Sequence, residues 1–274
     1  MSADVPPILY GTAWKEEATA ACVGAALAAG YRGIDTAAQR KHYDEASVGV
    51  ALAAALAAGT VTRAELFVQT KYTFARGHDH RLPYDPAAPI ATQVAQSCAR
   101  SQAQLGLDVI DSYVLHGPWR ADDLVAADDE AWDAMEALLD GGHVRALGVS
   151  NVTGHQLELL CRRARHRPSY VQNRCYARDG WDAEVRAVAA AHGVRYQGFS
   201  LLTANRAVVA GPVVGAIAGR HQLTPAQVVF AFARAMGMLP LTGTRDPAHQ
   251  ADDLAAMAVA LAPDEVRAIA AVRG

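Results

Sequence analysis

The sequence predicts a (β/α)8 TIM barrel that forms a single domain over residues 1–274. Its length is close to the roughly 250 residues typical of such barrels. Alanine-rich helical runs repeatedly end in a glycine that is followed at once by a short β-branched or aromatic strand. Because no Pro-, Gly- or Ser-rich linker divides the chain, we expect one uninterrupted alternation of strands and helices.

Eight segments are expected to form the strands. The first lies in "PPILYGTA", and one later strand, "SYVQNR", follows the helix "TGHQLELLCRRAR". The other six follow glycines that end helices, namely Gly30, Gly59, Gly106, Gly142, Gly193 and Gly237. In chain order the strands are expected within residues 6–13, 31–37, 66–71, 109–116, 144–151, 169–174, 194–200 and 238–243. Near-continuously apolar strands that alternate with helices favour a parallel sheet covered on its outside, and eight of them suggest closure into a barrel.

The composition narrows the class of protein. Hydrophobic residues make up 51% of the chain and charged residues 19%, which is enough for a large core. A net charge of -3 argues against nucleic acid or an anionic membrane as a partner. The chain shows neither a signal peptide nor an apolar run of about 18 residues, so we expect a soluble, cytoplasmic protein. The four cysteines lack C-x-x-C spacing and are expected to be reduced and buried.

Polar residues stand where the expected strands end. In a barrel these ends and the loops after them form the mouth that carries the active site. Asp35, Lys71 and His116 follow the second, third and fourth strands, and Tyr43 lies in the loop after the second. The fifth and sixth strands end in Ser150, Asn151, Gln172 and Asn173.

These residue types suit protonation of a carbonyl oxygen while hydride reaches its carbon. A tyrosine ordinarily titrates near 10, and a cation beside it lowers that pKa. Lys71 can supply the charge, Asp35 can hold Lys71 in place, and His116 can hydrogen-bond the substrate carbonyl. Each residue also has a structural interpretation: an ion pair, a core histidine, or helix caps at Ser150 and Asn151. Their convergence at one mouth favours a site. Metal binding by His78, Asp79 and His80 is less expected than an exposed, lid-like loop.

The chain resembles the aldo-keto reductase family. The resemblance rests on "YGTAW", "GYRGIDTA", "VQTK", "IDSYVLH", "GHVRALGVSN", "VQN" and "TPAQVVFAFARAMG", which occur in the family's order over almost the whole chain. It implies a barrel that binds a nicotinamide dinucleotide without a Rossmann fold, in agreement with the absence of G-x-G-x-x-G after a strand. By resemblance, the catalytic tetrad is Asp35, Tyr43, Lys71 and His116.

The resemblance also implies a set of cofactor-binding residues. Ser150, Asn151 and Gln172 match residues that hold the nicotinamide carboxamide, Gly11, Thr12 and Asp35 border the cofactor, and Phe199 stacks on the ring. Ser200, Leu201 and Leu202 follow the pyrophosphate. The adenosine end is expected among Leu241, Thr242, Gly243, Thr244, Arg245, His249, Asp252 and Asp253.

The sequence departs from the commoner family pattern at four places. Tyr43 comes eight residues after Asp35 instead of five, where Arg40 stands, so the loop "IDTAAQRKHYDE" must follow a different path. Phe199 replaces the usual stacking tyrosine. Leu241 and His249 stand where NADPH-preferring members often have lysine and arginine, which leaves Arg245 as the candidate phosphate partner. Residues 2–6 are too few for the usual N-terminal hairpin, and the terminal helix "APDEVRAIAAVRG" is expected to cover the barrel base instead.

The sequence thus predicts NAD(P)H-dependent reduction of an aldehyde or ketone to the alcohol, with Tyr43 as proton donor and Trp14 and Trp119 lining the substrate pocket. NADP(H) is the expected cofactor and NAD(H) the alternative; no metal is expected. Two other functions stay open: a nucleotide-binding regulatory barrel with little turnover, and a lyase or aldolase in which Lys71 forms a Schiff base. The substrate's identity and the oligomeric state have no signal in the sequence.

Overall fold

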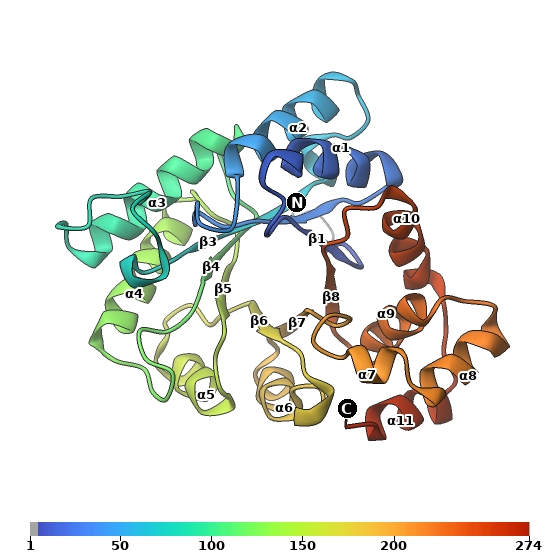
Figure 1. Ribbon diagram of the computed structural model, residues 1–274. Helices are drawn as coiled ribbons and strands as arrows, with labels where there is room; N and C mark the ends of the chain where they lie inside the picture. Colours follow the sequence, from blue (N-terminus) through green and yellow to red (C-terminus); the bar gives the residue numbers. More distant parts are fainter. Residues whose placement is uncertain (1–4, 274) are drawn as a thin grey trace.

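Eight parallel strands close into a barrel in the computed structural model, which describes residues 5–273 (Figure 1). Each strand pairs with its neighbours along the chain, and β1 pairs with β8 through Leu9↔Leu241 and Tyr10↔Thr242. The predicted fold class is therefore confirmed. Seven strands fall within the expected segments, and β3 runs one residue past its segment, to Tyr72. The strands are β1 Leu9–Gly11, β2 Gly33–Asp35, β3 Phe67–Tyr72, β4 Ser112–Leu115, β5 Leu147–Ser150, β6 Tyr170–Arg174, β7 Arg195–Phe199 and β8 Leu239–Thr242.

Helices surround the barrel on its outside (Figure 1). The six glycines expected after helices all have φ between 66° and 109°, a conformation that glycine adopts at little cost. Three elements lie between β7 and β8 instead of one helix, and two helices follow β8. The helices are α1 Thr19–Ala29, α2 Glu45–Ala57, α3 Ile90–Leu105, α4 Ala126–Asp140, α5 Gly154–Arg163, α6 Ala183–His192, α7 Arg206–Val209, α8 Pro212–His221, α9 Pro225–Ala235, α10 Pro247–Ala255 and α11 Pro263–Ala271, with short 3-10 turns at Glu16–Ala18, Arg63–Glu65, Ala75–Gly77, Ala177–Asp179 and Ala256–Ala258.

The barrel interior contains a polar layer directly beneath the mouth. The side-chain amide of Gln197 accepts from Gln69 and Gln172 and donates to Gln69, at 2.8–2.9 Å. Gln69 and Gln172 also donate to Asp35 Oδ1, at 2.7 and 3.0 Å. These side chains are at most 4% exposed, and mutual pairing satisfies their polar atoms. The layer therefore holds Asp35 from below.

The base of the barrel is closed by side chains near the strand starts. Leu9, Phe67, Tyr170 and Leu239 form a separate buried apolar cluster, and the rings of Phe67 and Tyr170 meet edge to face with centroids 5.6 Å apart. The expectation that the terminal helix covers the base is wrong, because α11 packs on α8 and α9 outside the barrel (Figure 1). The prediction that residues 2–6 form no hairpin concerns in part residues 2–4, which lie outside the described range.

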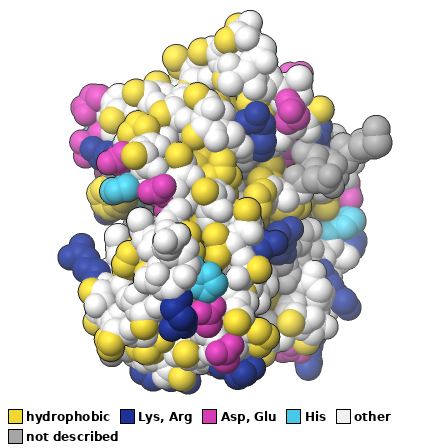
Figure 2. Space-filling view, turned by 90° about the vertical axis from the view of Figure 1, so that its right-hand side faces the viewer, with side chains coloured by type: hydrophobic (Ala, Val, Ile, Leu, Met, Phe, Trp, Pro, Cys, Tyr) yellow, Lys and Arg dark blue, Asp and Glu magenta, His cyan; other side chains and the backbone are white. Residues whose placement is uncertain are grey.

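The main apolar core fills the space between the strands and the helices around them. All four cysteines are buried and free, as expected. On the face that Figure 2 shows, acidic and basic side chains are scattered among neutral and apolar ones without a field of one sign. Within residues 5–273, no helix has the length and apolar character needed to cross a membrane.

Candidate active site

Asp35 and Lys71 form a buried ion pair at the mouth. Lys71 Nζ lies 2.7 and 2.8 Å from the two carboxylate oxygens of Asp35, and it donates a third hydrogen bond to the carbonyl of Thr36 at 2.8 Å. Lys71 has no exposed side-chain surface, and burial lowers its pKa while Asp35 opposes that shift. Its three hydrogen bonds hold Lys71 as a fixed cation beneath the mouth.

Tyr43 reaches this pair despite its longer loop. Its ring centroid lies 5.4 Å from Lys71 Nζ and 6.0 Å from the His116 ring, which it meets edge to face. The next residue, Asp44, accepts a hydrogen bond from Ser47 N and caps α2, which fixes the end of the loop. Arg40, at the spacing usual for the tyrosine, is exposed and pairs with Asp44 at 2.7 Å.

The pKa of Tyr43 shifts in the direction opposite to the one expected. Burial and the nearby charge of Asp35 raise the pKa of this phenol well above its usual 10. The expected lowering by Lys71 is therefore wrong for this geometry, because desolvation outweighs the attraction of the cation. The consequence is a phenol that keeps its proton at neutral pH, as a proton donor must.

His116 lies beside Tyr43 at the end of β4. Its Nδ1 is 2.7 Å from Thr73 Oγ1, and its backbone N–H donates to Tyr72 at 2.8 Å. Burial, then the charge of Lys71, and to a smaller extent His78 and His42, hold the pKa of His116 well below its usual value. The imidazole is therefore neutral at physiological pH.

The residues expected to hold the carboxamide occupy the next strand ends. Ser150 Oγ donates to the carbonyl of Gln172 at 2.6 Å, and Asn151 Nδ2 donates to the carbonyl of His116 at 2.8 Å. Asn151 is exposed at the mouth and has φ of 56°. The Gln172 amide instead points into the barrel and donates to Asp35 and Gln197. Thr12 is buried, and its hydroxyl donates to the backbone carbonyl of Asp35 at 3.1 Å.

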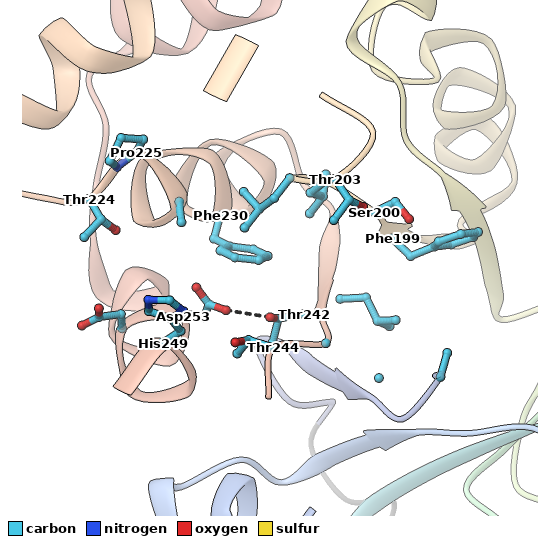
Figure 3. Close-up of a pocket in the computed structure, with 18 residues that line it drawn as sticks. Phe199, Ser200, Thr203, Thr224, Pro225, Phe230, Thr242, Thr244, His249 and Asp253 are labelled. Atoms are coloured by element: carbon cyan, nitrogen blue, oxygen red, sulfur yellow. Dashed lines mark hydrogen bonds between the residues drawn. The ribbon is translucent and has the colours of Figure 1, made fainter. Parts of the chain in front are cut away.

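A cavity of about 540 Å³ opens on the other side of the mouth, between the ends of β7 and β8 and helices α9 and α10 (Figure 3). Figure 3 shows Phe230 pointing from α9 into this space, near the hydrogen bond of 2.6 Å from Thr242 Oγ1 to Asp253. Burial raises the pKa of Asp253 to about 6. Predicted cofactor residues that line the cavity are Gly11, Phe199, Ser200, Leu201, Leu202, Leu241, Thr242, Gly243, Thr244, His249, Asp252 and Asp253.

Arg245 does not line this cavity. Its guanidinium donates to the backbone carbonyl of Trp14, across the seam between β8 and β1. No lysine or arginine is found among the described residues that line the cavity, whereas Asp252 and Asp253 are. A phosphate at the adenosine end would therefore gain the Arg245 guanidinium as a partner if Arg245 released Trp14.

The two tryptophans expected at the substrate pocket lie at the rim. Trp14 is 60% exposed and stacks on His42 with ring centroids 3.8 Å apart. Trp119 is 39% exposed, meets Phe74 edge to face, and lies under the guanidinium of Arg76. Trp14, His42 and Tyr43 line the same smaller polar pocket.

The loop after β3 is more firmly anchored than expected. His78 Nε2 lies 3.0 Å from the carbonyl of Thr73, and Tyr84 donates to the same carbonyl at 2.7 Å. Tyr84 is buried, whereas His80 and Arg81 are exposed, so the prediction of an exposed loop holds only in part. Asp79 pairs with Arg81 at 2.5 Å.

Sequence reasoning missed part of the cavity wall. Thr224 is the N-cap of α9, and Pro225 and Ala226 are its first residues; they belong to a family motif but were not predicted to line the cofactor site. The signal was available, since Thr224 and Gln227 form a capping box that places a helix N-terminus. Of the other missed residues, Ala13 lies in "YGTAW" and Phe230 in "TPAQVVFAFARAMG", whereas Thr203 belongs to no such motif. All six residues line the cavity.

Known proteins with similar sequences and structures were compared with this chain. The model of the Aldo/keto reductase family matches residues 8–273. An aldo-keto reductase of Mycolicibacterium paratuberculosis is 34% identical over 254 residues, which span 93% of this chain and 81% of that protein. Aldo-keto reductase family 1 member A1 of Rattus norvegicus is 28% identical, covering 98% of this chain and 86% of its own.

Solved structures of the same architecture are also similar. The structure of a Bombyx mori aldo-keto reductase in complex with NADP has a TM-score of 0.81 at 25% identity, with 98% of this chain and 91% of that chain covered. Aldose reductase from Schistosoma japonicum has a TM-score of 0.83 at 22% identity over 97% of this chain and 87% of its own, a likeness of fold.

Proposed function

The chain belongs to the aldo/keto reductase family and is an NAD(P)H-dependent carbonyl reductase, and we propose that Asp35, Tyr43, Lys71 and His116 are the residues that carry out its chemistry. The observation that carries this proposal is the position of the Tyr43 ring, which lies close to both Lys71 and His116. The substrate is a small-molecule aldehyde or ketone. The prediction that the enzyme works in the cytoplasm rests on the sequence.

The proposed mechanism uses Tyr43 as the general acid. The nicotinamide supplies the hydride when it is bound. Tyr43 keeps its phenolic proton until oxygen develops negative charge, and then transfers it to that oxygen. Lys71 stabilises the resulting phenolate, since its cationic nitrogen lies 5.4 Å from the ring centroid. Asp35 prevents Lys71 from moving.

His116 directs the carbonyl toward Tyr43. A neutral imidazole with a proton on the nitrogen facing the mouth donates a hydrogen bond to the substrate oxygen. Trp14 and Trp119 at the rim would contact the rest of the substrate and exclude water from the oxygen. The saturated hydrogen bonding of Lys71 disfavours the Schiff-base alternative, because its nitrogen has no free direction toward the mouth.

The cavity between β7, β8, α9 and α10 fits a nicotinamide dinucleotide in its donor chemistry. Phe199 offers an aromatic face next to the mouth, and Ser200, Thr242 and Thr244 offer hydroxyls along the wall. At the far end, carboxylates of Asp252 and Asp253 suit ribose hydroxyls and an exocyclic amine. Ser150 and Asn151 would hold the carboxamide. Gln172 would join them only by giving up its hydrogen bonds to Asp35 and Gln197.

We keep NADP(H) as the proposed cofactor in preference to NAD(H). Support comes from the similar Bombyx mori enzyme, whose structure contains NADP. In this chain the proposal requires Arg245 to exchange the Trp14 carbonyl for the 2'-phosphate, since a guanidinium pairs well with phosphate oxygens. NADH binding has no such requirement.

The first experiment measures binding and turnover separately. Tryptophan fluorescence of the purified protein is titrated with NADPH and with NADH, and the reduced-nicotinamide absorbance is then followed after addition of a reactive aromatic aldehyde. We expect saturable quenching and aldehyde-dependent oxidation of the nucleotide. Binding without oxidation across varied aldehydes would support the regulatory alternative, and failure of both nucleotides to bind would contradict the proposal.

A further inference from the structure

His116 can donate to a carbonyl oxygen only from a ring nitrogen that carries a proton. Neutral imidazole has one such nitrogen, and the hydrogen bond made by the other nitrogen decides which one it is. His116 is partly exposed at the mouth, and its Nε2 has no hydrogen-bond partner within the described chain. Nε2 is therefore the nitrogen available to a substrate, and the state of Nδ1 decides its usefulness.

Thr73 Oγ1 lies 2.7 Å from His116 Nδ1, in a setting where only one arrangement of protons satisfies both groups. Thr73 is 6% exposed, and its hydroxyl has no other hydrogen-bond partner among residues 5–273. If Nδ1 carried the proton and donated it, the hydroxyl proton of Thr73 would be left buried without an acceptor, which is costly. If the hydroxyl donates instead, Nδ1 accepts and the ring proton lies on Nε2.

We propose that Thr73 is a positioning residue whose hydroxyl donates to Nδ1 of His116 and thereby fixes the Nε2–H tautomer that binds the substrate carbonyl. The proposal rests on the proposed carbonyl reduction for its consequence, though not for the tautomer itself. The sequence did not predict a role for Thr73, because the recognisable motif "VQTK" ends two residues earlier, at Lys71.

The surrounding loop holds Thr73 at this position. The Thr73 carbonyl accepts from Tyr84 Oη at 2.7 Å and lies 3.0 Å from His78 Nε2. The Thr73 methyl packs against Gly77, where an added Cβ would come within 2.6 Å of it. A threonine hydroxyl on a backbone fixed from two sides can aim at Nδ1 without paying further entropy. The loop that contains His78 and Tyr84 thus contributes to the site by holding Thr73 in place.

The charges around His116 support the neutral form on which the tautomer argument depends. Burial is the main reason that the pKa of His116 is low, and the charge of Lys71 is the next largest cause. His78 and His42 add smaller contributions of the same sign. A neutral ring has two possible tautomers, so a group that selects one of them affects the reaction directly.

The test is to determine which ring nitrogen of His116 carries the proton. Protein labelled with ¹⁵N in histidine is studied by long-range ¹H–¹⁵N correlation NMR at pH 7, with His116→Asn used to assign the signals. We expect Nε2–H in the wild type, and a mixture or Nδ1–H in Thr73→Val, which keeps the shape and removes the hydroxyl. Thr73→Ser restores the hydroxyl and is expected to restore Nε2–H. A wild-type ring protonated on Nδ1 overturns the proposal, even if a variant fails to fold.

Turnover gives the second readout. In Thr73→Val we expect kcat/KM for a reactive aldehyde to fall about 10- to 100-fold, with NADPH affinity unchanged, and Thr73→Ser to recover most of it. Thr73→Val with an unchanged tautomer and full activity overturns the proposal. If the wild type binds no nucleotide or reduces no aldehyde, yet shows Nε2–H that is lost in Thr73→Val, the reductase function fails while the assignment to Thr73 stands.

Discussion

Tyr43 shows how a single side chain can reach a site by an unusual route. Asp35, Lys71 and His116 are fixed by the ends of three strands, whereas Tyr43 depends on the loop between β2 and α2. The loop is held on both sides of Tyr43: His42 O accepts from Trp14 N at 2.8 Å, and Asp44 caps α2. The extra loop length is thus taken up before Tyr43, which leaves the phenol beside Lys71.

Replacing Tyr43 by phenylalanine is expected to remove proton donation and keep the ring contact with His116. A general acid contributes typically about 10²- to 10⁴-fold, so we expect kcat to fall by that factor with nucleotide binding intact. Fluorescence titration and aldehyde turnover measure the two effects separately. Arg40→Met serves as the control, since Arg40 is exposed and occupies the spacing usual for the tyrosine; a comparable loss in that variant would contradict the assignment to Tyr43.

Arg245 allows a direct test of the cofactor preference. If it supplies the 2'-phosphate site, Arg245→Met is expected to weaken NADPH binding about 10- to 100-fold while NADH binding stays nearly unchanged, because only NADPH carries the extra phosphate. Dissociation constants from fluorescence titration at fixed ionic strength give the comparison. Equal weakening for both nucleotides would instead assign Arg245 to the hydrogen bond with Trp14, and the preference for NADPH would lose its basis.

At the scale of elements, the packing of α2 on α3 depends on a glycine. A Cβ added at Gly49 would lie 2.0 Å from the carbonyl oxygen of Gln104 and 3.1 Å from Leu105 Cα, both backbone atoms that cannot move independently. Gly24, inside α1, has nothing within 4 Å of the same position. A side chain therefore has no room at Gly49 in α2 and ample room at Gly24 in α1.

Alanine substitutions at these glycines are expected to change stability in opposite directions. Gly49→Ala must push the two helices apart and should lower the free energy of unfolding by about 1–3 kcal/mol or more. Gly24→Ala removes backbone freedom from the unfolded chain and should raise it by about 0.5–1 kcal/mol. Urea unfolding of both variants measures the difference; a Gly49→Ala variant as stable as the wild type would show that the α2 and α3 contact is loose.

The parts of the fold and site that the sequence predicted are those that depend on local interactions. Strand positions and helix ends were predictable, because apolar runs and glycines such as Gly30 and Gly106 determine them within a few residues. The extra helices α7 and α8 were not, because nothing local separates them from the helix that follows. The inward turn of Gln172 also escaped, since its partners Gln69 and Gln197 come from distant strands.

At the scale of the whole molecule, closure of the barrel brings together groups that no sequence window contains. Lys15 is buried and donates to the carbonyl of Gly243 at 2.7 Å, and Tyr10 donates to the carbonyl of Thr244 at 2.7 Å. Arg245 returns a hydrogen bond to the first loop at Trp14. The β1 and β8 ends are thus joined beyond their short pairing. Arg245, the candidate phosphate partner, takes part in this junction and does not line the cavity.

Glu45 makes the stability of the whole barrel depend on pH. It lies buried at the start of α2 and accepts from Thr70 on β3 and from Ser101 on α3 at 2.9 Å. Burial raises the pKa of Glu45 to about 7, against the lowering effects of those two hydroxyls, of Lys71 on β3 and of Arg100 on α3. Cys98 on α3 and Tyr113 on β4 also face the carboxyl, and its charge raises the pKa of both.

A folded-state pKa above the unfolded value means that protonation favours folding. The stabilising contribution is complete below the unfolded pKa near 4.5 and is lost as pH rises through about 7. Glu45→Gln removes this titration and keeps a hydrogen-bonding side chain. We therefore expect the unfolding free energy of the wild type, relative to Glu45→Gln, to fall by roughly 2–3 kcal/mol between pH 4.5 and pH 8.

Other titrating groups, such as Asp253, occur in both proteins and cancel in the difference. Urea unfolding at a series of pH values measures it. A difference that stays constant would mean that the pKa of Glu45 is the same in the folded and the unfolded protein, with Lys71 and Arg100 offsetting the effect of its burial.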